Sequence, residues 1–314
     1  MKVDNSKQQL VERIRQLKKE RDAVILAHYY TDGDVQDLAD FIGDSLALAR
    51  VATTLKEKVV VMCGVHFMGE TVKILCPDKT VLVPDLEAGC SLADSCPAEE
   101  FEAFIKEHPG HTVISYVNTS AAVKALTDIV VTSSNAVDIV ESLPKDEKII
   151  FGPDRNLGSY INSLTGRNMV VWNGACHVHE EFSVEKLVEL KRQYPQAKVL
   201  AHPECRKPIL LLADKVGSTK ALLDYAINSP YTQFIVATES GILHQMQRQC
   251  KDKEFIPAPP NDSTCACNNC SFMKLNTLEK LARCLETLEP QIHVDEALAA
   301  KARRPIDRML QLSK

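Results

Sequence analysis

Short apolar runs rich in valine and isoleucine alternate with helical patterns along almost the whole chain. They do not alternate strictly with polar residues, which is typical of parallel strands covered on both faces. The pattern predicts strands at Ala23–Tyr30, Lys58–Cys63, Thr80–Pro84, Thr112–Asn118, Asp128–Thr132, Lys148–Gly152, Met169–Asn173, Lys198–His202 and Gln233–Thr238. It predicts intervening helices such as Pro97–His108, Asn135–Leu143, Ser183–Tyr194 and Ser218–Asn228. This alternation indicates an α/β architecture with parallel sheets and right-handed crossovers.

The chain also reads as three copies of one unit. Each copy has a His or Tyr at a strand end, a serine 16 or 17 residues later, and a polar residue 21 positions beyond that serine. These markers are His28, Ser45 and His66; Tyr116, Ser133 and Asp154; and His202, Ser218 and Glu239. The spacing favours a triplicated module. We expect modules at residues 1–96, 97–182 and 183–276, followed by C-terminal helices over 277–314 that pack on the body.

Composition and charge restrict the class of protein. The longest apolar runs are five residues, whereas a membrane-spanning helix needs about 20. The net charge is −5, from 37 basic and 42 acidic residues, so no basic surplus exists to displace counterions from nucleic acid. The polar N-terminus is unlike a secretory signal. The nucleotide-binding motifs G-x-G-x-x-G and G-x-x-x-x-G-K-[ST] do not occur in the sequence. We expect a soluble cytoplasmic protein that binds neither nucleic acid nor a membrane.

Polar residues gather where the predicted strands end and the next helices begin. They are His28, Tyr30, Tyr116, Asn118, His202 and Glu204 at strand ends, with Ser45, Ser133, Ser218 and Thr219 at helix starts. In open parallel sheets, functional residues collect at the carboxyl ends of the strands. Each serine alone is explained as a helix N-cap. Three in register also suit hydroxyls and helix N–H groups that converge on a carboxylate or phosphate.

Eleven cysteines are many for a chain of 314 residues without an export signal, which favours metal-binding or catalytic thiols over disulfides. Five of them, Cys63, Cys76, Cys205, Cys250 and Cys284, lie in apolar segments and are interpreted as small buried hydrophobic residues. Each predicted module instead ends in a loop that carries a cysteine, and the three are Cys90, Cys176 and Cys270. If the modules pack around a pseudo-three-fold axis, these thiolates meet at one end of it. They could then hold a [4Fe–4S] cluster with one iron lacking a protein ligand, or a zinc ion with a bound water.

Two local clusters have weaker interpretations. Cys265 and Cys267 precede Cys270 at a spacing that fits neither a zinc ribbon nor a C-x₃-C-x₂-C motif. We interpret them as spare or redox-active thiols. The run Cys176-His177-Val178-His179-Glu180 is too crowded for every side chain to bind one ion, so His179 or Glu180 is expected beside the ligand Cys176.

Over essentially its whole length the chain resembles the quinolinate synthase family, the iron–sulfur enzymes of de novo NAD biosynthesis. The motifs that carry the resemblance are Ala27-His-Tyr-Tyr30, Gly43-Asp-Ser45, Glu87-Ala-Gly-Cys90, Tyr116-Val-Asn-Thr-Ser-Ala121, Thr132-Ser-Ser-Asn135, Phe151-Gly-Pro-Asp-Arg-Asn-Leu-Gly158, Gly174-Ala-Cys-His-Val-His179, His202-Pro-Glu-Cys205, Gly217-Ser-Thr219 and Cys270-Ser-Phe-Met-Lys-Leu-Asn276. The resemblance implies three pseudo-three-fold related three-layer αβα modules, with the cluster and active site at their junction. One cysteine from each module, Cys90, Cys176 and Cys270, would hold one [4Fe–4S] cluster per chain.

The same resemblance implies a transferase that condenses iminoaspartate with dihydroxyacetone phosphate, giving quinolinate, phosphate and two waters. The open iron would act as a Lewis acid, and L-aspartate oxidase is a possible functional partner. The residues placed around the substrate are His28, Tyr30, Ser45, Tyr116, Asn118, Ser133, His202, Glu204, Ser218 and Thr219. On chemical grounds the catalytic roles go to Tyr30, Tyr116, His202 and Glu204, which would move or assist protons.

Two other hypotheses stay open at this stage. An iron–sulfur hydro-lyase acting on a hydroxy-acid would use the same open iron without a phosphorylated substrate. A redox sensor or a zinc-scaffolded binding module would need the polar strand ends only as caps.

Overall fold

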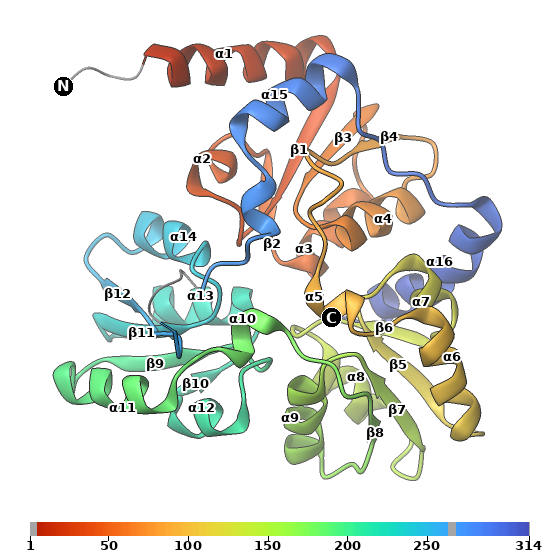
Figure 1. The fold of residues 1–314 in the computed structure, drawn as a ribbon, viewed down its shortest axis with the longest axis vertical. Helices are drawn as coiled ribbons and strands as arrows, with labels where there is room; N and C mark the ends of the chain where they lie inside the picture. The colour runs from red at the N-terminus through yellow and green to blue at the C-terminus, as the bar shows by residue number, and fades with distance from the viewer. Residues whose placement is uncertain (1–4, 263–267, 314) are drawn as a thin grey trace. The chain divides into compact units, whose positions relative to one another are not determined.

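The computed structural model describes residues 5–262 and 268–313. The chain divides into two compact units, one made of residues 1–90 and 271–300 and the other of residues 91–270 and 301–314. Figure 1 labels the elements. The described residues form three four-stranded parallel sheets, which confirms the α/β fold with three αβα modules. The boundaries proposed between the modules stay a prediction.

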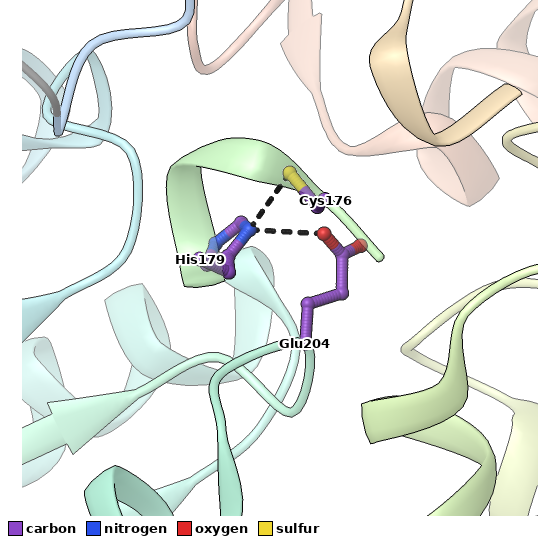
Figure 2. Close-up of side chains that lie close together, drawn as sticks. All are labelled: Cys176, His179 and Glu204. Atoms are coloured by element: carbon purple, nitrogen blue, oxygen red, sulfur yellow. Dashed lines mark hydrogen bonds and ion pairs between the residues drawn. The ribbon is translucent and has the colours of Figure 1, made fainter. Parts of the chain in front are cut away.

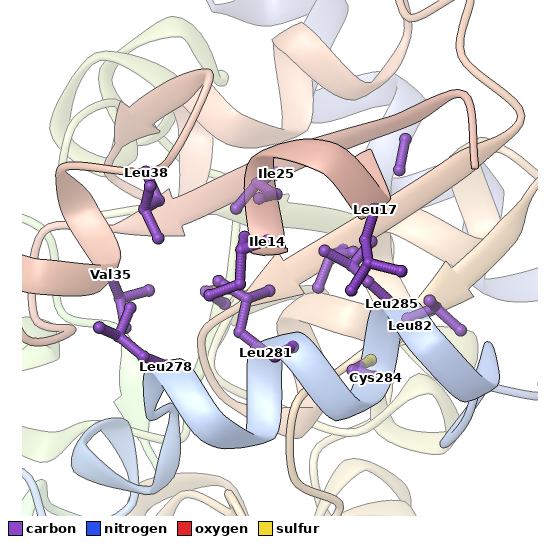
Figure 3. Close-up of a cluster of buried hydrophobic side chains, with 14 of the residues drawn as sticks. Ile14, Leu17, Ile25, Val35, Leu38, Leu82, Leu278, Leu281, Cys284 and Leu285 are labelled. Atoms are coloured by element: carbon purple, nitrogen blue, oxygen red, sulfur yellow. The ribbon is translucent and has the colours of Figure 1, made fainter. Parts of the chain in front are cut away.

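The first unit holds one sheet, in the order β2-β1-β3-β4. Its elements are α1 (Asn5–Glu20), β1 (Ala23–His28), α2 (Gly33–Gln36), β2 (Phe41–Gly43), α3 (Ser45–Ala52), β3 (Val59–Cys63), α4 (His66–Leu75), β4 (Thr80–Leu82), a 3₁₀ turn (Met273–Leu275) and α15 (Leu278–Thr287). Every residue of β1 and β3 is buried, as the unbroken apolar runs predict. Figure 3 shows that Leu278, Leu281 and Leu285 of α15 pack with Ile14 and Leu17 of α1 in the core of this unit.

The second unit holds the other two sheets, in the orders β6-β5-β7-β8 and β10-β9-β11-β12. Its second-module elements are α5 (Ser91–Asp94), α6 (Ala98–Glu107), β5 (Thr112–Tyr116), α7 (Ala121–Ala125), β6 (Ile129–Val131), α8 (Ala136–Ser142), β7 (Ile149–Gly152), α9 (Arg155–Thr165) and β8 (Val170–Val171). The third module has α10 (His177–Glu180), α11 (Val184–Gln193), β9 (Lys198–Ala201), α12 (Lys207–Leu212), β10 (Lys215–Val216), α13 (Thr219–Asn228), β11 (Gln233–Ala237), α14 (Ile242–Gln249) and β12 (Glu254–Pro257). A last helix, α16, runs over Glu296–Leu312.

The three sheets repeat one topology and one local hydrogen bond. In each sheet, a backbone N–H of the first strand donates to the aspartate that directly precedes the neighbouring edge strand. The three bonds are Ile25 N to Asp40 Oδ2 at 2.8 Å, Val113 N to Asp128 Oδ2 at 2.8 Å and Val199 N to Asp214 Oδ2 at 2.9 Å. These aspartates are 88 and 86 residues apart, as are the first markers of the three units. The triplication is therefore present in the atomic contacts as well as in the strand order.

Three strands, β2, β10 and β12, were not predicted from the pattern. They have three, two and four residues, and each lies at the edge of its sheet. Most of their residues are exposed or half-buried, so they lack the apolar run that marks a buried strand. In the described part of the chain, no helix is long and apolar enough to cross a membrane.

Candidate active site

Within the second unit, Tyr116 and Glu204 meet from two different sheets. Tyr116 is the last residue of β5, and Glu204 follows the end of β9. Tyr116 Oη donates to Glu204 Oε1 at 2.6 Å, and both residues are buried. The structure thus brings two of the four predicted catalytic residues into direct contact.

His179 completes this contact and links it to the loop of Cys176. Figure 2 shows His179 on α10 and Cys176 directly before this helix, with the Glu204 carboxylate facing both side chains. His179 Nδ1 lies 2.9 Å from Glu204 Oε2 and 3.3 Å from Cys176 Sγ, and its Nε2 lies 3.0 Å from Thr238 Oγ1. An ionised carboxylate only accepts hydrogen bonds, so Nδ1 of His179 carries a proton here. Of the two residues expected beside Cys176, His179 is the one in contact with its sulfur.

The surroundings of Glu204 favour its charged form. Burial by itself would raise the pKa of this carboxyl group, but the charge of a protonated His179 and the hydrogen bonds from His179 and Tyr116 more than offset burial and lower the pKa. Glu204 is therefore an ionised acceptor that holds the Tyr116 hydroxyl and the His179 ring in fixed orientations.

His202 lies beside the same carboxylate and contacts a predicted serine. Its Nδ1 accepts from the backbone N–H of Glu204 at 3.4 Å, so Nε2 of the neutral ring carries the proton. Nε2 lies 3.1 Å from Ser133 Oγ and donates to it. The second unit thus joins Tyr116, Ser133, His202 and Glu204 in one hydrogen-bonded group.

In the first unit, His28 has the same geometry as His202. Its Nδ1 accepts from Tyr30 N at 3.2 Å, and the two rings pack edge to face with centroids 4.5 Å apart. Lys274 Nζ donates to the Tyr30 carbonyl at 2.8 Å. These contacts fix Tyr30 relative to His28 within this unit.

The predicted serines differ in their local roles. Ser218 is the N-cap of α13 and accepts from Ala221 N at 3.3 Å, while Thr219 is the first residue of that helix. Ser45 is not a cap, because Asp44 caps α3 by accepting from Ala47 N at 2.9 Å. Ser133 is not a cap either, since the N-cap of α8 is Asn135. Helix capping therefore accounts for Ser218 alone among the three serines.

The three cysteine loops are anchored in the same way. The residue three positions after the third strand of each module donates to the carbonyl two positions before the cysteine: His66 N to Ala88 O at 2.7 Å, Arg155 N to Gly174 O at 2.8 Å and Ser240 N to Asn268 O at 3.0 Å. Cys90, Cys176 and Cys270 therefore occupy equivalent positions in the three modules.

Exposure separates these three thiols from the others. Among the cysteines that the structure describes, Cys90, Cys176 and Cys270 are partly exposed, and the rest are buried. Burial raises the pKa of the Cys96 and Cys284 thiols to about 12 and raises that of Cys205 further above its usual range, so these remain protonated. Cys265 and Cys267 lie outside the described residues. Each module thus carries one partly exposed thiol, which is a donor suited to a metal group.

Two buried carboxyl groups near these loops were noted in the sequence without an assigned role. Glu239 Oε1 accepts from Cys270 N at 3.1 Å and its Oε2 from Gly241 N at 2.6 Å. Asp154 caps α9, accepting from Leu157 N at 2.7 Å, and burial together with Glu204 raises its pKa well above the usual value. The equivalent residue in the first module is Val65, two positions after β3, so the sequence marker at His66 was wrong by one position.

The fold and the site define a class of protein: a triplicated α/β enzyme with one partly exposed loop thiol in each module and, in its second unit, a buried Tyr–Glu–His group next to Cys176. Comparison with known proteins gives the particular family. The family model described as Quinolinate synthetase A protein matches residues 12–311. A quinolinate synthase from Thermosynechococcus vestitus is 58% identical over 304 residues, covering 97% of this chain and 95% of the relative. One from Chloroherpeton thalassium is 57% identical over 305 residues, covering 97% and 95%. The chain belongs to the quinolinate synthase family.

Proposed function

We propose that this chain is a quinolinate synthase that condenses iminoaspartate with dihydroxyacetone phosphate, releasing quinolinate, phosphate and two waters. The observation that carries the proposal is the family match over residues 12–311. The site supports it with groups suited to moving protons during two dehydrations. We further propose that L-aspartate oxidase, which would produce iminoaspartate, is the functional partner.

The thiols of Cys90, Cys176 and Cys270 are the proposed ligands of a [4Fe–4S] cluster. Their equivalent loops and their partial exposure support this choice. Such a cluster normally has four cysteine ligands, so three leave one iron open as a Lewis acid for a substrate hydroxyl or carboxylate.

Tyr116 and Glu204 form the proposed proton-transfer pair. The phenolic hydrogen already points at Glu204 Oε1 across 2.6 Å. The carboxylate can take this proton as Tyr116 Oη takes one from the substrate, and can return it for the departure of water. The lowered pKa of Glu204 keeps the carboxylate ionised at neutral pH, so it begins the step as a hydrogen-bond acceptor rather than a donor. His202 assists by holding the backbone N–H of Glu204.

The remaining predicted residues are proposed to bind the anionic groups of the substrates. They are His28, Ser45, Asn118, Ser133, Ser218 and Thr219, whereas Tyr30 is proposed as a further proton-transfer residue. Ser133 Oγ accepts a hydrogen bond from His202 Nε2, so its own hydroxyl group can donate to a carboxylate or phosphate oxygen. Hydroxyl and amide donors suit these oxygens, and no arginine is among these residues.

Anaerobic purification followed by metal analysis and a product assay on the same sample tests the proposal. We expect about four irons and four sulfides per chain, and quinolinate from iminoaspartate with dihydroxyacetone phosphate. Stoichiometric zinc would refute the cluster, and a hydroxy-acid dehydrated without quinolinate formation would favour the hydro-lyase.

The Tyr116–Glu204 pair has its own test. Tyr116→Phe removes the transferred proton and Glu204→Gln removes its acceptor, so each should lower kcat by about 10²-fold or more while iron content stays normal. His293→Gln, at an exposed position remote from both residues in the sequence, is the control and should keep wild-type turnover. Full activity of either variant with a complete cluster would exclude the assigned roles.

A further inference from the structure

Two buried polar side chains make the same pair of hydrogen bonds in two different modules. Gln36 Nε2 donates to the carbonyls of Tyr29 at 2.9 Å and Thr31 at 2.8 Å. Lys124 Nζ donates to the carbonyls of Val117 at 2.8 Å and Thr119. The two side chains are almost fully buried. They lie 88 residues apart, which is the spacing of the first two modules.

Each pair of carbonyls brackets one predicted site residue. Gln36 binds on both sides of Tyr30, and Lys124 binds on both sides of Asn118. A buried polar group that is fully hydrogen-bonded fixes the backbone it contacts, because breaking the bonds would leave buried carbonyls unpaired. Both turns are also held by a threonine: Thr31 Oγ1 donates to His28 O at 2.9 Å and Thr119 Oγ1 to Tyr116 O at 3.1 Å.

The two hydrogen bonds from Lys124 also set the direction of the Asn118 N–H. In a trans peptide the C=O and N–H groups point in opposite directions, so holding the Val117 carbonyl toward Lys124 turns the Asn118 N–H away from it. In the other two modules the equivalent N–H, of Tyr30 or Glu204, donates to a histidine Nδ1. Tyr116 offers no such acceptor, and within residues 5–262 and 268–313 Asn118 makes no hydrogen bond.

We propose that Lys124 is a positioning residue for Asn118 and that Gln36 is the corresponding positioning residue for Tyr30. Lys124 holds the turn so that the N–H and the carboxamide of Asn118 receive an anionic oxygen of the substrate, from a carboxylate or a phosphate. The inference rests on the proposed function and extends it to two residues outside the recognised motifs of the site.

The third module indicates which substitutions the fold tolerates. Leu210 occupies the equivalent position there, 86 residues after Lys124, on the matching helix α12. A module therefore folds with an apolar side chain at this position. Lys124→Leu reproduces that module, and Lys124→Gln reproduces the first module with its two hydrogen bonds.

Steady-state kinetics of the cluster-loaded enzyme separates these variants. Lys124→Leu should raise the KM for an anionic substrate about tenfold, or about 1.4 kcal/mol, with kcat changed much less. Lys124→Gln should restore KM to within about threefold of wild type, because glutamine offers the same donors. In an Asn118→Ala background the effect of Lys124→Leu should shrink, since the two residues act through one turn.

Several results would overturn the inference. A wild-type KM for Lys124→Leu, or equal losses for Lys124→Leu and Lys124→Gln, would exclude positioning through the two carbonyls. If Lys124→Leu does not fold, Gln36→Leu tests the same device in the first module and should lower kcat through Tyr30. If the wild type makes no quinolinate, the proposed function fails. Calorimetric binding of inorganic phosphate then tests Lys124 separately, and equal affinities of wild type and Lys124→Leu would exclude its role.

Discussion

The cysteine loops of the first and third modules have the same backbone anchor but different side chains beneath it. In both, the residue three positions after the third strand donates to the carbonyl two positions before the cysteine. In the third module the Glu239 carboxylate also accepts from Cys270 N and Gly241 N. In the first module the equivalent residue is the buried Val65, whose side chain has no hydrogen-bond acceptor. The repeat therefore preserves the backbone frame of the loop, while the side chains below it are specific to each module.

This difference predicts that the three cysteine loops have the same role but differ in rigidity. The position of the thiol is set by the backbone bond that all three loops have. The rigidity of the loop is set by the side chain below, which is ionisable in the second and third modules and apolar in the first. Substitutions at the thiols test the shared role, and substitutions below them test the difference.

The largest effect is expected from the thiols themselves. Cys90→Ala, Cys176→Ala and Cys270→Ala should each lower bound iron and sulfide by about tenfold or more, because a cluster held by three thiolates is lost when one is removed. Iron and sulfide analysis after anaerobic reconstitution measures this loss.

Cys96→Ala is the matched control for these variants. Its thiol is buried and its raised pKa keeps it protonated, so the variant should retain the wild-type iron content. Retention of a complete cluster by any one of the three ligand variants would show that its loop does not share the role of the other two.

A smaller effect is expected from the carboxylate that distinguishes the third module. Glu239→Val imitates Val65 and removes the acceptor for two backbone N–H groups, which should lower the free energy of unfolding by about 2 kcal/mol. It should also speed alkylation of Cys270 in the cluster-free protein, followed by mass spectrometry, while the rate at Cys90 stays unchanged.

Glu239→Gln gives the intermediate case. Its carboxamide oxygen keeps one of the two hydrogen bonds, so the loss of stability and the gain in alkylation rate should fall between wild type and Glu239→Val. Equal alkylation of Cys270 in all three proteins would show that the carboxylate does not restrain the loop.

Most of the fold could be predicted from the sequence because it depends on short-range patterns. The buried central strands β1 and β3 are unbroken apolar runs, and the spacing of polar residues at strand ends marks the triplication. The three loop cysteines were distinguishable from cysteines in apolar segments such as Cys205, and the structure agrees in their burial.

Other parts could not be predicted because they depend on contacts between distant residues. The bond from Tyr116 to Glu204 joins side chains 88 residues apart, and His179 enters it from a third segment. Lys124 was absent from the candidate site because a lone lysine normally faces solvent. Only the structure shows its side chain buried against the turn of Asn118.

The smallest effect is expected from Asp214, the equivalent of Asp40 and Asp128 in the other modules. Burial tends to raise the pKa of Asp214, but the hydrogen bonds from Val199 N and Lys198 and the charge of Lys198 lower it below the usual 3.8. The folded state thus favours the ionised carboxylate, so Asp214 stabilises the protein above about pH 3.8 and this contribution disappears as the pH falls through the folded pKa. Asp214→Asn should lower the free energy of unfolding by about 1 kcal/mol at pH 7, and the difference from wild type should shrink towards zero in acid. Lys198→Met, measured by the same denaturant titrations, should remove part of this pH dependence, because the Val199 N–H bond remains. A difference between wild type and Asp214→Asn that is independent of pH would mean that the aspartate acts through shape and hydrogen bonding alone, as a neutral side chain could.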